Sequence, residues 1–259
     1  MQHKFKKQFG QNFISDVNLL KAIVSDAKVD KNDQVLEIGA GGGALTKWLS
    51  QVAEKVVSYE IDLSLESQLL SLGLENVKFV FKDALKAPIE EIEKDFDGGY
   101  KLVANLPYYI TSPLIFKFLS QSSKVKSLTI MVQKEVAERI VAKAGSKDFG
   151  VLSLMCQFYS NPKITRNVGK QMFFPQPKVD SALVHLEIDK KGDMPGDKFY
   201  EFVKKCFSMR RKTLINNLQG FKNLSKSEIA KKLPEFDLNL RPEDFSLEQY
   251  ILMFKKIGN

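Results

Sequence analysis

Short apolar segments of the kind that form buried strands alternate with helical patterns, and this alternation constrains the fold more than any other feature. The predicted strands are 35–38, 56–60, 77–81, 101–106 and 128–133, and the predicted helices are 43–53, 112–121 and one beginning near Lys134. Such alternation favours a parallel, doubly wound α/β sheet. Ligands of these sheets bind at the carboxyl ends of the strands, so we look for site residues there.

A polar segment rich in glycine, proline and charge, 189–197, is followed by a region in which only helical patterns occur. These patterns cover 198–208, 210–219, 225–233 and 246–257, and Asp244 or Ser246 can cap the last of them. We therefore expect an α/β domain over 1–188, a linker over 189–197 and a smaller all-α domain over 198–259.

Positive charge is concentrated at the two ends of the chain, which has a net charge of +8. Residues 1–12 carry +3, residues 13–189 carry −1 and residues 190–259 carry +6. Basic ends on a near-neutral body favour a polyanionic partner such as RNA, and the alternative is ordinary solubilising charge. The candidate phosphate contacts are Lys4, Lys6, Lys7, Arg210, Arg211 and Lys212.

Several classes of protein are disfavoured by composition. No apolar run approaches the roughly 20 residues of a membrane helix, and the basic N-terminus has no apolar core of a signal peptide. The two cysteines, Cys156 and Cys206, and the two histidines form neither a disulfide framework nor a metal-binding spacing. We expect a cytoplasmic, monomeric protein with no metal and no membrane partner.

The first predicted strand runs into a glycine-rich turn, EIGAGGGALT, over 37–46. Gly39 and Gly41 allow a tight turn and a close approach of the backbone to a ligand, and a helix N-terminus follows. Nicotinamide enzymes and enzymes that use S-adenosylmethionine (SAM) share this spacing, and a turn without a ligand is a third alternative. Glu60, which closes the second strand, can accept hydrogen bonds from ribose hydroxyls, and Asp83, which closes the third, can face an adenine edge.

The fourth strand ends in NLPYY, Asn105 to Tyr109, which is poor material for a core. An adenine amine is a weak nucleophile because its lone pair is delocalised into the ring. Hydrogen-bond acceptors for its two N–H groups localise that lone pair on nitrogen. The candidate acceptors are the side-chain oxygen of Asn105 and a main-chain carbonyl near Leu106 or Pro107. Pro107 stiffens the turn, and Tyr108 offers a face for stacking. No strong base is required.

A second aromatic element, FFPQPKVDS, spans Phe173 to Ser181. The prolines at 175 and 177 hold this segment rigid. Phe173 can close the other side of a bound base, and the alternative is an aromatic residue of the core.

These segments together resemble the rRNA adenine dimethyltransferases. The motifs occur in the family's order: HKFKKQFGQNF, EIGAGGGALT, YEID, KDAL, NLPYYITSPL, QKEVAERI, FFPQPKVDSAL and RRKTLINNL. The resemblance runs from about residue 3 to 254 and is greatest to the KsgA-type branch, which modifies two adjacent adenosines near the 3′ end of small-subunit (16S) rRNA. It implies a Rossmann-like SAM-dependent methyltransferase domain followed by a helical RNA-binding domain, acting on the pre-30S particle.

The resemblance also assigns residues. The implied SAM contacts are Asn12, Ile14, Gly39, Glu60, Asp83 and Asn105, and the glycine turn adds Gly41 as a candidate contact. The implied pocket for the target adenine consists of Asn105, Leu106, Pro107, Tyr108 and Phe173, and it implies no metal. Two positions depart from the family pattern: Ile14 stands where leucine is usual, and Tyr109 stands where asparagine is usual.

Three alternative functions are kept open. A non-catalytic RNA-binding assembly or transcription factor can use this fold. The presence of Asn105, Glu60 and Asp83 argues against a protein that has lost its catalytic activity. A large-subunit rRNA methyltransferase usually has NIPY and PKVNS, where this chain has NLPY and PKVDS. A nicotinamide dehydrogenase explains only the glycine turn.

Overall fold

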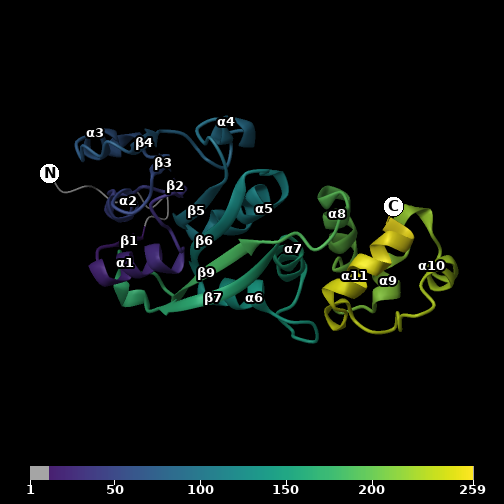
Figure 1. Ribbon diagram of the computed structural model, residues 1–259. Coiled ribbons are helices and arrows are strands. Elements are labelled where there is room, and N and C mark those ends of the chain that lie inside the picture. The colour runs from purple at the N-terminus through teal and green to yellow at the C-terminus, as the bar shows by residue number, and fades with distance from the viewer. Residues whose placement is uncertain (1–11, 259) are drawn as a thin grey trace. The chain divides into compact units, whose positions relative to one another are not determined.

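The computed structural model describes residues 12–258 (Figure 1). Contacts between Cα atoms divide the chain into two compact units. Unit 1 consists of Met1–Ala137 and Pro162–Ile188, and unit 2 consists of Glu138–Asn161 and Asp189–Asn259. Residues 138–161 therefore group with the C-terminal part of the chain. The predicted division into domains at 188 and 198 stays a prediction.

A seven-stranded sheet forms the centre of the α/β fold, in the order β4-β3-β2-β5-β6-β9-β7. The strands are β2 (Gln34–Ile38), β3 (Lys55–Tyr59), β4 (Val77–Val80), β5 (Tyr100–Asn105), β6 (Val125–Gln133), β7 (Ser160–Val168) and β9 (Ser181–Ile188). The pairs β2–β3, β3–β4, β2–β5 and β5–β6 are parallel, whereas β9 pairs antiparallel with β6. The predicted Rossmann-like α/β class is confirmed, and β7 and β9 are strands that the sequence analysis did not identify.

Among the described residues, six α-helices belong to or begin in unit 1, and each helix predicted for this part of the chain is present. They are α1 (Val17–Asp26), α2 (Ala44–Ser50), α3 (Glu66–Leu70), α4 (Ile89–Glu93), α5 (Thr111–Gln121) and α6 (Lys134–Val141). Helix α2 begins at Ala44 because Gly43, with a φ of +79°, serves as its N-cap. A short antiparallel ribbon of β1 (Phe13–Ile14) and β8 (Phe173–Phe174) completes the unit.

The core of unit 1 explains the position of α1. Asp16 caps this helix by accepting a hydrogen bond from the backbone N–H of Leu19, 2.7 Å away. Apolar residues at helical spacing, including Leu20 and Ile23, then pack into a buried cluster with residues of α2, β2 and β3. Ile14 of β1 and Phe173 of β8 belong to the same cluster, so the core holds the short ribbon in place.

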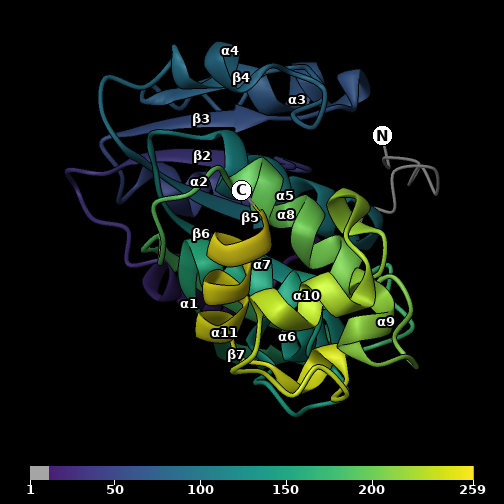
Figure 2. The ribbon, with the colours of Figure 1, turned by 90° about the vertical axis from the view of Figure 1, so that its right-hand side faces the viewer.

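Unit 2 is helical (Figure 2). Aromatic side chains pack against one another in its core. Its helices are α7 (Val151–Tyr159), α8 (Gly196–Cys206), α9 (Leu214–Leu218), α10 (Lys226–Lys232) and α11 (Leu247–Met253). Ser246, rather than Asp244, caps α11 by accepting from the N–H of Gln249. Phe254 packs against both Phe199 and Phe202, with ring centroids 5.4 and 5.6 Å apart.

Two boundaries in this part of the chain differ from the predictions. Helix α8 begins at Gly196, inside the predicted linker, with Pro195 at its N-cap. The predicted helix 210–219 is shortened to α9, since residues 207–212 form turns held by the side chain of Asn217, whose amide donates to the carbonyl of Met209 and whose oxygen accepts from its N–H. None of the described helices is long and apolar enough to cross a membrane.

Candidate active site

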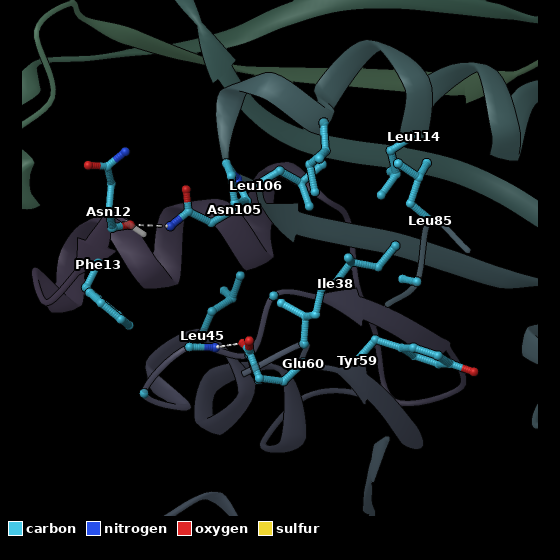
Figure 3. Close-up of a pocket in the computed structure, with 18 of the residues that line it drawn as sticks. Asn12, Phe13, Ile38, Leu45, Tyr59, Glu60, Leu85, Asn105, Leu106 and Leu114 are labelled. Atoms are coloured by element: carbon cyan, nitrogen blue, oxygen red, sulfur yellow. Dashed lines mark hydrogen bonds between the residues drawn. The ribbon is translucent and has the colours of Figure 1, made fainter. Parts of the chain in front are cut away.

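A cavity of about 390 Å³ opens at the carboxyl ends of β2, β3 and β5 (Figure 3). It lies at the place where ligands of open α/β sheets bind. All seven residues predicted to bind SAM line it, as do Leu106 and Pro107. These are Asn12, Ile14, Gly39, Gly41, Glu60, Asp83 and Asn105. Parallel register brings them together, because Ile38 pairs with both Tyr59 and Ala104, so that the next residues, Gly39, Glu60 and Asn105, share one edge of the sheet.

The glycine turn requires glycine at the two positions that the sequence singled out. Gly39 has a φ of +84° and Gly41 a φ of +54°, a region that other residues rarely adopt. A Cβ on Gly41 would lie 2.9 Å from the ring of Phe13, and one on Gly39 would lie 3.4 Å from the main-chain oxygen of Asn105. The turn is therefore packed directly against two other segments of the cavity wall.

Glu60 is buried and is held by two backbone groups. One carboxylate oxygen accepts from the N–H of Gly41 and the other from the N–H of Asp62, each at 2.8 Å. A carboxylate has about four acceptor positions, so both oxygens retain a position for further donors. The side chain is thus fixed while it can still accept hydrogen bonds from the hydroxyls of a ribose, and Figure 3 shows it across the cavity from Asn12 and Asn105.

Asp83 stands three residues after the end of β4, not at the strand end, because β4 finishes at Val80. One of its side-chain oxygens accepts from the N–H of Leu85 at 2.9 Å, and its carbonyl accepts from the N–H groups of Lys86 and Ala87. This tight loop, 83–87, brings Ala84 and Leu85 to the cavity wall beside Asp83.

Asn105 is oriented by a residue far away in the sequence. Its side-chain N–H donates to the main-chain carbonyl of Asn12, 3.0 Å away, as the dashed line in Figure 3 shows. The geometry fixes which end of the carboxamide is the acceptor. No described residue donates to its side-chain oxygen, so this oxygen is available to an N–H group of a ligand.

Three aromatic residues, Tyr108, Tyr109 and Phe173, differ in their positions relative to the cavity. The hydroxyl of Tyr108 lies 2.7 Å from that of Ser181 at the start of β9, and Tyr108 does not line the cavity. Phe173 is only 4% exposed and packs in the core beside Ile14. Tyr109 lines the cavity and is 66% exposed. Contact of Tyr108 and Phe173 with a base stays a prediction, and it would require both rings to be accessible from outside this cavity.

Glu37 was part of the glycine-turn motif, but the sequence analysis gave it no function. It is fully buried on β2, and its Oε2 accepts from Thr46 of α2 at 2.6 Å and from Ser58 of β3 at 2.5 Å. Burial raises the pKa of Glu37 to about 7, although the two hydroxyls oppose that shift. The Glu37 carboxyl group therefore connects β2, α2 and β3, the three elements around the glycine turn.

The candidate phosphate contacts fall into two groups. Lys4, Lys6 and Lys7 lie outside the described residues. Arg210, Arg211 and Lys212 lie in the turns between α8 and α9 rather than on a helix, and all three are exposed. Arg210 donates to the carbonyls of Lys147 and Phe149, whereas Arg211 and Lys212 make no side-chain hydrogen bond or ion pair within the described part of the chain.

The cavity fits SAM. Its volume falls in the range of small-molecule sites, its walls are mostly apolar, and a carboxylate and an amide face it from opposite sides. The glycine turn contributes its backbone to the cavity wall, because a side chain at Gly41 would collide with Phe13. Among residues 12–258, no cluster of His, Cys, Asp and Glu could hold a metal ion.

Comparison with known proteins agrees with this geometry. The sequence model of the family described as ribosomal RNA adenine dimethylase matches residues 2–258. A protein of Clostridioides difficile named ribosomal RNA small subunit methyltransferase A is 42% identical, over 96% of this chain and 90% of that protein. One of the same name from Alkaliphilus oremlandii is 44% identical over the same shares.

Solved structures show the same fold. A dimethyladenosine transferase from Plasmodium falciparum has a TM-score of 0.81 and 28% identity, covering 95% of this chain and 98% of that one. The 23S rRNA methyltransferase ErmE has a TM-score of 0.72 at 24% identity, which shows a shared fold alone. Because these matches cover nearly the whole chain, the alternative of a nicotinamide dehydrogenase has no support. The chain belongs to the ribosomal RNA adenine dimethylase family.

Proposed function

We infer that this protein transfers methyl groups from SAM to the exocyclic amines of two adjacent adenosines near the 3′ end of 16S rRNA. The observation that carries this inference is the carboxamide of Asn105, whose N–H end is bound to Asn12 while its oxygen is left for a ligand. The relatives that are 38 to 44% identical share the name of a small-subunit methyltransferase, and this supports the choice of rRNA.

The cofactor is SAM, which supplies a methyl group on a positively charged sulfur and carries its own leaving group. Glu60 would bind the ribose hydroxyls with the acceptor positions that Gly41 and Asp62 leave unused. The loop 83–87 would flank the adenine, and Gly39 and Gly41 would allow the methionine part to pass close to the backbone. These residues hold the methyl donor in place, so they supply position rather than acid–base chemistry.

Asn105 would act on the target adenine. Its side-chain oxygen accepts one N–H of the amine, and the main-chain carbonyl of Leu106 accepts the other. The carbonyl of Pro107 already accepts from the N–H of Ile110, which favours Leu106 for this role. Holding both N–H groups concentrates the lone pair on nitrogen and stabilises the positive charge that develops there. Tyr108 would stack on the base once it is turned out of its strand, and Phe173 would have to turn out of the core to reach the other face of the base.

The basic residues would bind the RNA backbone outside the cavity. We assign phosphate contacts to Lys4, Lys6 and Lys7 at the N-terminus and to the 210–212 turn of unit 2. We also propose that the substrate is the pre-30S particle and that the enzyme acts as a monomer in the cytoplasm, where ribosomal subunits are assembled.

The decisive experiment is incubation of the purified protein with labelled SAM and unmodified small subunits, followed by mapping of the methylated positions. Two dimethylated, adjacent adenosines near the 3′ end are expected. Methylation of large-subunit rRNA instead would favour the large-subunit class of enzyme. RNA binding without any methyl transfer would favour a non-catalytic assembly factor.

A further inference from the structure

Lys117 is an almost fully buried lysine that no part of the proposed chemistry uses. It lies on α5, its exposed fraction is 9%, and its ammonium donates to the main-chain carbonyls of Ala84, Leu85 and Ala87. The first two of these hydrogen bonds are 2.8 and 3.0 Å long. Three acceptors match the three N–H groups that only a protonated lysine carries.

These three carbonyls belong to the 83–87 loop, which forms one wall of the cavity. The N–H groups of Leu85, Lys86 and Ala87 donate to Asp83. Asp83 therefore binds N–H groups of the loop, and Lys117 binds its carbonyl groups. Burying a lysine is costly, and burial lowers the pKa of Lys117 while the charge of Asp83 opposes that shift. The contacts with the loop offset this cost.

Helix α5 also forms another wall of the same cavity. Ile110, which precedes it, and Leu114, on its second turn, line the cavity, and Figure 3 shows Leu114 beside Leu85. The helix follows directly on the Asn105–Tyr109 turn. Lys117 therefore connects the 83–87 loop to the helix that continues from the candidate chemical residues.

We propose that Lys117 is a positioning residue for SAM, because it fixes the 83–87 loop in the conformation that receives the adenosine part of the cofactor. This inference rests on the proposed function, since it takes the cavity as the SAM site. Without the ammonium, the loop would populate other conformations, and binding would have to restore the competent one. The apparent affinity then equals the intrinsic affinity multiplied by the fraction of protein in the competent conformation.

The test compares Lys117→Met with a matched control, Lys124→Met. Lys124 also donates to two main-chain carbonyls, those of Glu93 and Phe96, at 3.1 and 2.7 Å, but its loop does not line the cavity. Calorimetry would measure binding of S-adenosylhomocysteine and of 5′-methylthioadenosine, which lacks the amino-acid part. Steady-state assays on unmodified small subunits would give KM for SAM and kcat.

Lys117→Met is expected to weaken both ligands by the same factor, about tenfold, and to raise KM for SAM similarly. At saturating SAM, kcat stays within about twofold of wild type, because Asn105 is untouched. Lys117→Arg, which keeps a cationic donor, should recover part of the affinity. Lys124→Met should bind both ligands as wild type does, even if it unfolds at a lower temperature.

Three results would overturn the proposal: unchanged affinity in Lys117→Met, equal weakening in Lys124→Met, or a loss confined to kcat. If Lys117→Met does not fold, Lys117→Gln replaces it under the same criteria. Failure of the wild-type protein to bind S-adenosylhomocysteine would instead contradict the proposed function itself.

Discussion

The two sides of the cavity are built differently. We define the cofactor-side wall as Gly39–Gly41, Glu60 and the 83–87 loop. Both carboxylate oxygens of Glu60 and one of Asp83 accept hydrogen bonds from backbone N–H groups in this wall. The base-side wall, Asn105–Tyr109, has one hydrogen bond that orients Asn105 and one that ties Tyr108 to Ser181, and it ends in the exposed ring of Tyr109.

This difference indicates which part of the site is complete before RNA arrives. The cofactor-side wall needs no further partner to reach its geometry, so SAM should bind to the protein alone. The base-side wall presents an acceptor oxygen and aromatic rings whose ligand must come from outside. Substitutions on the two sides should therefore separate cofactor affinity from methyl transfer.

The largest effect is expected from Asn105→Ala on the base-side wall. Loss of one preorganised acceptor should slow single-turnover methyl transfer by on the order of 100-fold at saturating SAM and RNA. Some loss of SAM affinity should accompany it, since Asn105 lines the cofactor cavity. Asn76→Ala is the matched control, because this amide also donates to main-chain carbonyls, those of Ser50 and Ala53, away from the cavity. A wild-type transfer rate in Asn105→Ala would remove Asn105 from the chemistry.

The next effect is expected on the cofactor-side wall. Glu60→Ala should weaken SAM binding by roughly 1–3 kcal/mol, because buried acceptors for the ribose are lost. Glu60→Gln should weaken it too, since an amide N–H would face the N–H of Gly41 or Asp62. RNA affinity should not change in either variant. Calorimetry that finds wild-type SAM affinity in both variants would remove Glu60 from the site.

The cofactor-side wall could be predicted from the sequence because parallel strands fix its geometry. Gly39 and Glu60 each follow a strand and Asn105 ends one, and the carboxyl ends of parallel strands share one edge of the sheet. Asp83 could be placed only approximately, since β4 ends three residues earlier and a loop carries the side chain to the cavity.

The base-side residues depend on contacts that are distant in the sequence. Tyr108 is positioned by Ser181, 73 residues away, and Phe173 by the pairing of β8 with β1. A pattern of residues does not reveal which of two adjacent aromatics, Tyr108 or Tyr109, will reach the cavity. The sequence does not indicate that Lys117 is buried against the 83–87 loop, because a lysine among apolar residues of a helix usually extends its charge into water.

A smaller effect is expected from the buried acid beneath the glycine turn. Glu37 has a pKa of about 7 in the folded protein against an ordinary value of 4.5. Between these values the unfolded chain has lost the proton and the folded chain keeps it, so Glu37 lowers the free energy of unfolding as the pH rises from about 4.5 to 7. Glu37→Gln lacks this dependence. Relative to wild type, its free energy of unfolding should rise by on the order of 2 kcal/mol across that range. A constant difference between the two proteins in urea unfolding would contradict the prediction.

The smallest effect concerns how RNA is held outside the cavity, and the structure separates residues that the sequence had grouped. Arg211 and Lys212 are exposed and make no side-chain hydrogen bond or ion pair with any described residue, whereas Arg210 donates to the carbonyls of Lys147 and Phe149. Arg211→Ala and Lys212→Ala should each lower the slope of log K against log salt by about 1, with little change in stability. Arg210→Ala should instead lower the free energy of unfolding by about 1 kcal/mol, because two carbonyls lose their donor.

Lys82→Met supplies the matched control for these salt titrations, because Lys82 lines the cavity on the cofactor side and already pairs with Glu91 at 2.5 Å. If the cofactor-side wall contacts no phosphate, this variant keeps the wild-type salt slope even though it also loses one positive charge. An equal fall in slope for Lys82→Met and Arg211→Ala would mean that RNA affinity follows net charge alone. An unchanged slope in both Arg211→Ala and Lys212→Ala would show that the 210–212 turn serves only the packing of unit 2, and the phosphate contacts would then have to be sought elsewhere on the protein.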